Sequence, residues 1–159
     1  IDTVSSLREM GLKIGSTTGY TAEMMDVVTP LVAKKGYAPD CIITPDHVNG
    51  RGRPYPYMLW ENIERMGLLT ADQVVKVGDT KADMEEGKNA GCICVGVMEG
   101  SSMMGLSLQE YKELSKEERS MHSKTVKRSF ISAGADYVIR DISRLPELIQ
   151  AIEREKEAV

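Results

Sequence analysis

Short apolar runs alternate along this chain with longer segments in which apolar residues recur every three or four positions. The runs predict buried strands, and the periodic segments predict helices. The strands are expected at "LKIGSTT", "CIIT", "QVVKVGD", "CICVGV" and "ADYVIRD". The helices are expected at residues 1–10, 21–36, 54–66, 80–91, 108–133 (in two pieces) and 142–155.

Residues at the predicted helix ends support this division. Thr21 is expected to cap one helix at its N-terminus, and Gly36 and Gly91 are expected to stop two helices. Pro30 predicts a kink or break inside the helix at 21–36. Pro54 is expected to be the first residue of its helix, since proline suits that position.

Alternating strands and helices predict an α/β fold, with a mostly parallel sheet and helices on both faces. The length of 159 residues suits one domain over residues 1–159. In such sheets, ligands bind beyond the carboxyl ends of the strands. The loops that follow the strands are therefore where functional side chains are expected.

Composition excludes several classes of protein. Lysine and arginine number 20 against 24 acidic residues, which gives a net charge of 20 − 24 = −4 and argues against a nucleic-acid partner. No apolar run approaches the roughly 20 residues of a membrane span, and no signal peptide opens the chain. Cys41, Cys92 and Cys94 lie in apolar runs and are interpreted as reduced core thiols, with redox and metal roles as alternatives. A cytoplasmic protein without a membrane partner is expected.

Small hydroxyl residues follow the first predicted strand in "GSTTG". Ser16, Thr17 and Thr18 precede a helix, where hydroxyls and backbone N–H groups can bind a phosphate. The alternative is ordinary helix capping. A second loop carries Arg53, which can direct two donors at a phosphate oxygen. Arg51 is a competitor, and Arg53 is preferred because Pro54 fixes the backbone beside it.

Two carboxylates, Asp79 and Asp83, stand where the third predicted strand passes into a helix. Their spacing places them on one face of the first helical turn, and hard oxygen ligands of this kind suit Mg²⁺. The alternative for Asp83 is the acidic start of a helix, favoured by the helix dipole. A fourth loop, at residues 100–102, is expected at the same edge of the sheet.

These motifs, in this order, resemble the second, third and fourth motifs of the haloacid dehalogenase superfamily. The strings "KIGSTTGYTAEMMD", "GRPYPYM", "KVGDTKADMEEGKNAG" and "GVMEGSSMMGLS" are similar to the phosphonatase (phosphonoacetaldehyde hydrolase) family within it. The resemblance implies a three-layer Rossmann-like core. It also implies hydrolysis of the carbon–phosphorus bond of phosphonoacetaldehyde to acetaldehyde and phosphate, through a Schiff base and an aspartyl-phosphate, with Mg²⁺ as cofactor.

The resemblance assigns a role to each matching residue. Asp79 would bind Mg²⁺ directly, and Asp83 would support that site from behind or through water. Arg53 would stabilise the phosphoryl group and the nucleophile. Ser16 and the amide of Thr17 would bind phosphoryl oxygens beside Thr18, and Tyr20 would face the aldehyde end of the substrate.

The chain departs from the family because nothing in it matches the first motif, which carries the nucleophilic aspartate, or the cap domain with its lysine. It begins with Ile1 and is interpreted as the carboxyl-terminal part of a phosphonatase, inactive alone and a homodimer when complete. The nucleophile strand is expected between the strands near residues 12–16 and 74–78. Two alternatives stay open: a phosphatase or phosphomutase acting on a C–O–P substrate, and a phosphate-binding module that is not an enzyme.

Overall fold

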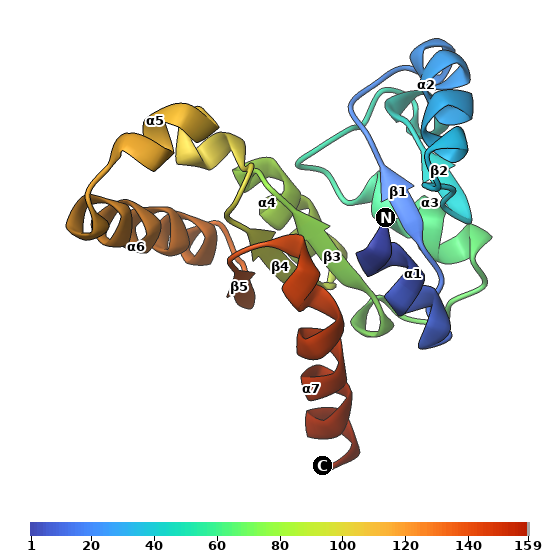
Figure 1. The fold of residues 1–159 in the computed structure, drawn as a ribbon. Coiled ribbons are helices and arrows are strands. Elements are labelled where there is room, and N and C mark those ends of the chain that lie inside the picture. The colour runs from blue at the N-terminus through green and yellow to red at the C-terminus, as the bar shows by residue number, and fades with distance from the viewer. Residues whose placement is uncertain (159) are drawn as a thin grey trace. The chain divides into compact units, whose positions relative to one another are not determined.

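The structure of the protein, a computed structural model, describes residues 1–158 as parallel strands joined by helices (Figure 1). The predicted α/β class is confirmed. The strands are β1 (Gly15–Thr17), β2 (Cys41–Ile43), β3 (Val75–Gly78), β4 (Ile93–Val97) and β5 (Tyr137–Ile139). The helices are α1 (Asp2–Glu9), α2 (Ala22–Lys34), α3 (Tyr57–Arg65), α4 (Lys81–Ala90), α5 (Leu108–Glu113), α6 (Lys116–Ser132) and α7 (Leu145–Glu157).

The described strands form two sheets. In one, β1 pairs with β2 in parallel, with Gly15 opposite Cys41. In the other, the parallel order is β3-β4-β5, with Val75 opposite Ile93. Both β1 and β3 therefore lie at a sheet edge, and these are the strands that the superfamily resemblance places beside the nucleophile strand. The intervening strand stays a prediction.

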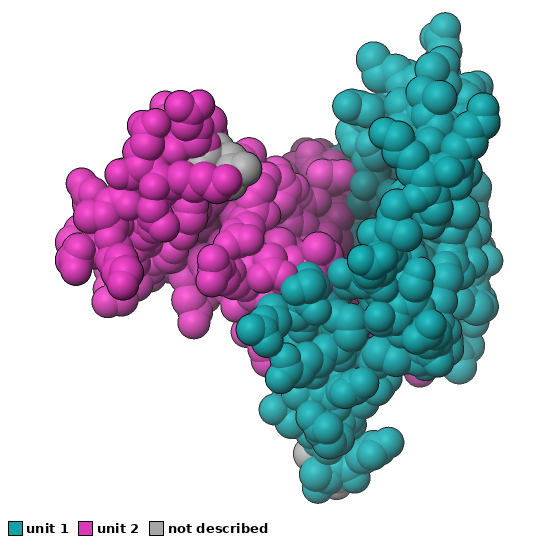
Figure 2. Space-filling model, viewed as in Figure 1, with its two compact units in different colours: residues 1–52, 56–69, 143–159 teal, residues 53–55, 70–142 magenta. Residues whose placement is uncertain are grey.

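Contacts divide the chain into two compact units, coloured separately in Figure 2. Unit 1 comprises Ile1–Gly52, Pro56–Leu69 and Ser143–Val159. Unit 2 comprises Arg53–Tyr55 and Thr70–Ile142. The expectation of one domain over the whole chain stays a prediction.

The core of unit 1 lies between its sheet and α3. Ile43 on β2 and Met58 on α3 are fully buried, and Val48 packs beside them. Asn62, also on α3, is buried and donates hydrogen bonds from Nδ2 to the carbonyls of Ser16 and Met58, both at 3.2 Å. This amide ties the middle of β1 to α3.

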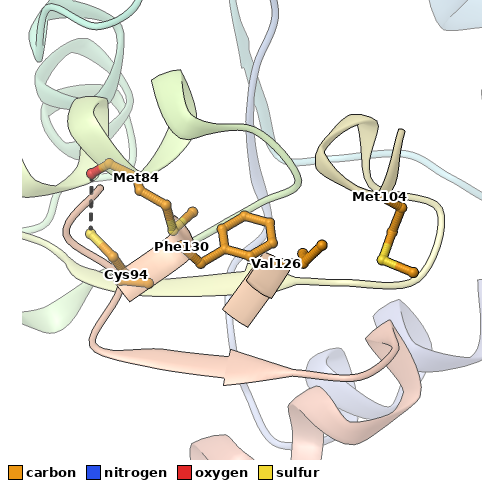
Figure 3. Close-up of a cluster of buried hydrophobic side chains, with 6 residues drawn as sticks. Met84, Cys94, Met104, Val126 and Phe130 are labelled. Atoms are coloured by element: carbon orange, nitrogen blue, oxygen red, sulfur yellow. Dashed lines mark hydrogen bonds between the residues drawn. The ribbon is translucent and has the colours of Figure 1, made fainter. Parts of the chain in front are cut away.

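The core of unit 2 lies between its sheet and the helices α4 and α6. Met84 on α4, Cys94 on β4 and Phe130 on α6 are fully buried and gather in one cluster (Figure 3). Phe130 fits because Gly96 has no side chain: a Cβ there would lie 2.6 Å from the phenyl ring. Burial raises the pKa of Cys92 to about 12 and that of Cys94 to about 11, so both are protonated thiols at neutral pH.

Most of the predicted helix ends are confirmed. The Thr21 hydroxyl caps α2 by accepting a hydrogen bond from the Met24 amide, and Gly91 ends α4 in the left-handed conformation at φ +85°. The helical region from residue 108 forms two helices, α5 and α6. Strands β3, β4 and β5 fall inside the runs predicted for them.

Two predictions about prolines differ from the structure. The predicted break at Pro30 is wrong, because α2 continues through this exposed residue, and water can bond the Asp26 carbonyl that the proline leaves without a donor. A kink at Pro30 stays a prediction. Pro54 is not the first helical residue, because α3 begins at Tyr57 and its N-cap is Pro56. A residue that precedes proline avoids the helical conformation, so Pro56 keeps Tyr55 out of the helix.

Candidate functional site

Asp79 directly follows β3, at the carboxyl end of the strand. Its side chain is exposed and, among the described residues, makes no hydrogen bond or ion pair. Its backbone is held: the carbonyl of Asp79 accepts a hydrogen bond from the Ser101 hydroxyl at 2.7 Å. Ser101 is buried, and its hydroxyl also accepts from the Met103 amide. The loop at 100–102 therefore anchors the backbone of Asp79 and leaves the carboxylate accessible to a ligand.

Asp83 is the third residue of α4 and is buried. Its Oδ2 accepts hydrogen bonds from the Thr80 hydroxyl at 2.6 Å and the Thr80 amide at 3.2 Å. The Thr80 hydroxyl in turn accepts from the Asp83 amide, which completes a reciprocal cap at the start of the helix. Gly78 makes room for this carboxylate, since a Cβ there would lie 2.2 Å from the Asp83 Cβ.

The other oxygen of Asp83 contacts two cations. Oδ1 lies 2.9 Å from Arg53 Nη1 and 3.1 Å from Lys76 Nζ. Burial works to raise the pKa of Asp83, but the Lys76 ammonium, the Thr80 hydroxyl and the Arg53 guanidinium together outweigh it and hold the pKa below the usual value. Asp83 is therefore a carboxylate at neutral pH, engaged on both oxygens.

Glu86 and Lys76 complete a group of four charges in unit 2. Glu86 is fully buried on α4, and its Oε2 lies 2.7 Å from Lys76 Nζ and 3.4 Å from Arg53 Nε. Each cation thus contacts both carboxylates, in a closed ring of two positive and two negative groups. Sequence reasoning missed Glu86 and gave Lys76 no role, although a lysine inside the apolar run "VVKVG" was a signal that a buried acid would accompany it.

Arg51 and Arg53, the two candidate phosphate-binding arginines, have different surroundings in the structure. The Arg51 guanidinium stacks over the Tyr57 ring, 3.7 Å from its centroid, and its Nε donates to the Val48 carbonyl. Arg53 instead reaches Asp83 and Glu86, while 23% of its side chain stays exposed. Arg53 is therefore the arginine that belongs to the group of four charges in unit 2, the acidic site.

The remaining predicted residues lie in unit 1, at and after β1. Ser16, Thr17 and Thr18 are half-buried, and the Thr18 hydroxyl accepts a hydrogen bond from the Tyr20 amide at 3.1 Å. Tyr20 is 53% exposed, just before α2. The Ser16 hydroxyl makes no hydrogen bond with a described residue. The convergence of this loop with Arg53 and Asp79 on one ligand stays a prediction.

The side chains of unit 2 fit a magnesium ion at Asp79 better than at Asp83. Mg²⁺ needs only one or two carboxylates because it keeps several waters. No group of three or more histidine, cysteine or acidic side chains in the described part of the chain is arranged for a metal. The accessible carboxylate of Asp79 suits direct binding, whereas both oxygens of Asp83 already have partners.

Comparison with known proteins gives a family and several relatives. The family "haloacid dehalogenase-like hydrolase" matches residues 1–91. The chain is 50% identical over 153 residues to the phosphonoacetaldehyde hydrolase of Lysinibacillus sphaericus, covering 96% of this chain and 57% of that protein. It is 43% identical over 155 residues to the same enzyme of Bacillus thuringiensis, covering 98% and 58%.

A solved structure shares the fold. The phosphonoacetaldehyde hydrolase-like protein of Oleispira antarctica superposes with a TM-score of 0.87 at 29% identity, over 96% of this chain and 55% of that one. The chain thus spans little more than half the length of these relatives. No described helix is long and apolar enough to cross a bilayer. The family match over residues 1–91 covers more than half of the chain. The chain therefore belongs to the haloacid dehalogenase-like hydrolase family.

Proposed function

We propose that the protein carrying this chain hydrolyses the carbon–phosphorus bond of phosphonoacetaldehyde, with Mg²⁺ as cofactor. The observation that carries the proposal is the 50% identity over 153 residues with the phosphonoacetaldehyde hydrolase of Lysinibacillus sphaericus. The reaction takes up one water: the carbon–phosphorus bond breaks, the carbon gains a proton to give acetaldehyde, and phosphorus gains the oxygen to give phosphate.

The loop after β1 is proposed to bind the phosphoryl oxygens. The Ser16 hydroxyl and the Thr17 amide donate hydrogen bonds to them, with Thr18 beside the group. The absence of a described partner for the Ser16 hydroxyl supports this role, since a ligand oxygen would be its acceptor. Tyr20, exposed after this loop, is proposed to contact the aldehyde end.

The acidic site of unit 2 is proposed to neutralise the negative charge of the phosphoryl group. Arg53, whose side chain is 23% exposed, donates to a phosphoryl oxygen, and Asp79 would hold the metal ion. Mg²⁺, when bound, neutralises negative charge on the phosphoryl group. Asp83 holds Arg53 in place, and its two occupied oxygens support an indirect role in the metal site.

The proposed route includes a Schiff base and an aspartyl-phosphate. Carbon is a poor leaving group unless its developing negative charge is delocalised, and a protonated imine provides that delocalisation. The proposal assigns neither the lysine nor the nucleophilic aspartate to a residue of this chain. Lys76 is unsuited to an imine because its ammonium is buried against Asp83 and Glu86.

The test is an assay of the full-length protein that carries the chain, with phosphonoacetaldehyde and Mg²⁺. We expect acetaldehyde and phosphate in equal amounts, lost on addition of a chelator and recovered with excess Mg²⁺. Phosphate release from p-nitrophenyl phosphate, without turnover of phosphonoacetaldehyde, would overturn the proposal in favour of a C–O–P phosphatase.

Asp79→Asn is the matching variant. We expect it to lower Mg²⁺-dependent turnover by about 100-fold or more, because the accessible carboxylate of the site is removed. The control is Asp26→Asn, which changes an exposed carboxylate on α2 and should leave turnover unchanged. Equal activity of the two variants would contradict the role of Asp79.

A further inference from the structure

The three residues Arg53–Tyr55 belong to unit 2, although the segments on both sides of them in the chain belong to unit 1. Two residues of this segment, Arg53 and Pro54, contact one helix of unit 2. Arg53 reaches Asp83 at 2.9 Å and Glu86 at 3.4 Å. The carbonyl of Pro54 accepts a hydrogen bond from Asn89 Nδ2 at 2.9 Å. All three partners lie on α4.

These partners form a stripe along the helix. Asp83 and Glu86 are three residues apart, as are Glu86 and Asn89, so each pair is adjacent on the surface of α4 and the stripe turns by about 60° around the helix at each step. The stripe contacts two parts of the segment. The two acids form ion pairs with the guanidinium of Arg53, and the amide donates a hydrogen bond to the backbone just after it. Two acids contact two different nitrogens of a planar group, so they restrict its orientation as well as its position.

Two buried acids against one partly exposed arginine would leave an excess of negative charge, which is costly in a buried site. Lys76 removes the excess, since its ammonium lies 3.1 Å from Asp83 and 2.7 Å from Glu86. Gly87 gives the lysine its space: a Cβ there would lie 2.9 Å from Lys76 Cγ. Loss of any one of the four groups leaves the ring with a net charge.

We propose that Glu86, Asn89 and Lys76 are positioning residues for Arg53. Glu86 and Asn89 fix the guanidinium and its backbone against α4, and Lys76 pairs with both carboxylates of the ring and so offsets its second negative charge. This inference deepens the proposed function and rests on it for the reaction that Arg53 serves. The positioning itself is measurable without any turnover.

The test uses Glu86→Gln in the full-length protein, with Glu85→Gln as the matched control, because Glu85 is the exposed neighbour on the same helix. The spectroscopic signal is the ¹⁵Nε–¹Hε resonance of Arg53, assigned by its loss in Arg53→Lys. We expect Glu86→Gln to broaden or average this resonance and to lower kcat/KM by about 10- to 100-fold. Glu85→Gln should change neither.

A double variant separates charge balance from a general loss of structure. Lys76→Met with Glu86→Gln leaves Arg53 and Asp83 as a neutral pair, so it should recover stability lost in either single variant. Asn89→Ala serves if the buried variants do not fold. This variant removes an exposed amide. It should broaden or average the Arg53 resonance with little change in melting temperature.

The outcomes separate the two proposals. An unchanged Arg53 resonance in both Glu86→Gln and Asn89→Ala would overturn the positioning inference, whatever the activity. A broadened or averaged Arg53 resonance in the variants of a protein that never turns over phosphonoacetaldehyde would support the positioning and contradict the proposed function. A broadened or averaged resonance with unchanged turnover would overturn the claim that positioning serves the reaction.

Discussion

The two oxygens of the Asp83 carboxylate perform different tasks. Oδ2 accepts hydrogen bonds from Thr80 and so caps α4, while Oδ1 contacts the cations Arg53 and Lys76. Asp83 is therefore both a helix-capping residue and a member of the charged site. A carboxylate has lone pairs enough for both, and burial makes both partners necessary.

The pKa of Asp83 predicts how stability depends on pH. The pKa is lower in the folded protein than the usual 3.8, so the folded state favours the ionised form. The contribution to the free energy of unfolding is complete above pH 3.8 and is lost as the pH falls through the lower folded value. Urea titrations at several pH values should show stability falling in this range, and Asp83→Asn should reduce that slope. An unchanged slope in the variant would contradict the prediction.

Gly78 is a second residue at which a single atom matters. A Cβ at this position would lie 2.2 Å from the Asp83 Cβ, so Gly78→Ala must displace α4 or the end of β3. We expect a loss of about 2 kcal/mol or more in the free energy of unfolding. Gly19→Ala is the control, because no atom lies within 4 Å of its added Cβ. Denaturant titration of both variants gives the comparison, and equal losses would argue against a close-packed turn at Gly78.

At the scale of elements, unit 2 is organised by the passage from β3 to α4. The strand ends at Gly78, Thr80 caps the helix, and Gly91 ends it before β4 begins. Met84 on this helix packs in the core of unit 2, and Asp83 and Glu86 on the same helix form ion pairs with Arg53. One short helix thus joins the hydrophobic core to the candidate site.

The packing of α6 on the sheet predicts which side chains carry stability. Phe130 is fully buried in the cluster with Met84 and Cys94, so Phe130→Ala should lower the free energy of unfolding by about 3–5 kcal/mol. The next residue, Ile131, is 53% exposed, and Ile131→Ala should cost less than about 1 kcal/mol. Thermal or urea unfolding of the two variants distinguishes them. Similar losses at both positions would mean that α6 does not pack as described.

At the scale of the whole molecule, net charge governs which partners are attracted over a distance. The charge of −4 repels the phosphate backbone of nucleic acids. Fluorescence anisotropy with a labelled DNA or RNA 20-mer at physiological salt should detect no binding tighter than about 10⁻⁴ M, the weak end of non-specific affinities. A micromolar affinity that weakens steeply with salt would refute this prediction and reveal a local basic surface.

Local patterns along the chain predict the order and type of the elements. Apolar runs such as "CIIT" and "CICVGV" became strands, and caps at Thr21 and Gly91 set helix ends, because these signals are local. The start of α3 was predicted wrongly, because Pro56 overrides the preference of Pro54. The order of the motifs identified the family, since its site residues follow strands whose positions are locally encoded.

Which charged side chains contact one another depends on how the elements pack. The periodicity of α4 marks Glu86 as one residue among several acids, and nothing local says that it faces Lys76 and Arg53. Likewise, Ser101 holds the backbone of Asp79 across two loops that are separate in the chain. Such pairings depend on how a strand, a helix and a distant loop pack together. A pattern of neighbouring residues encodes each element, whereas a contact between elements exists only once they are folded against one another.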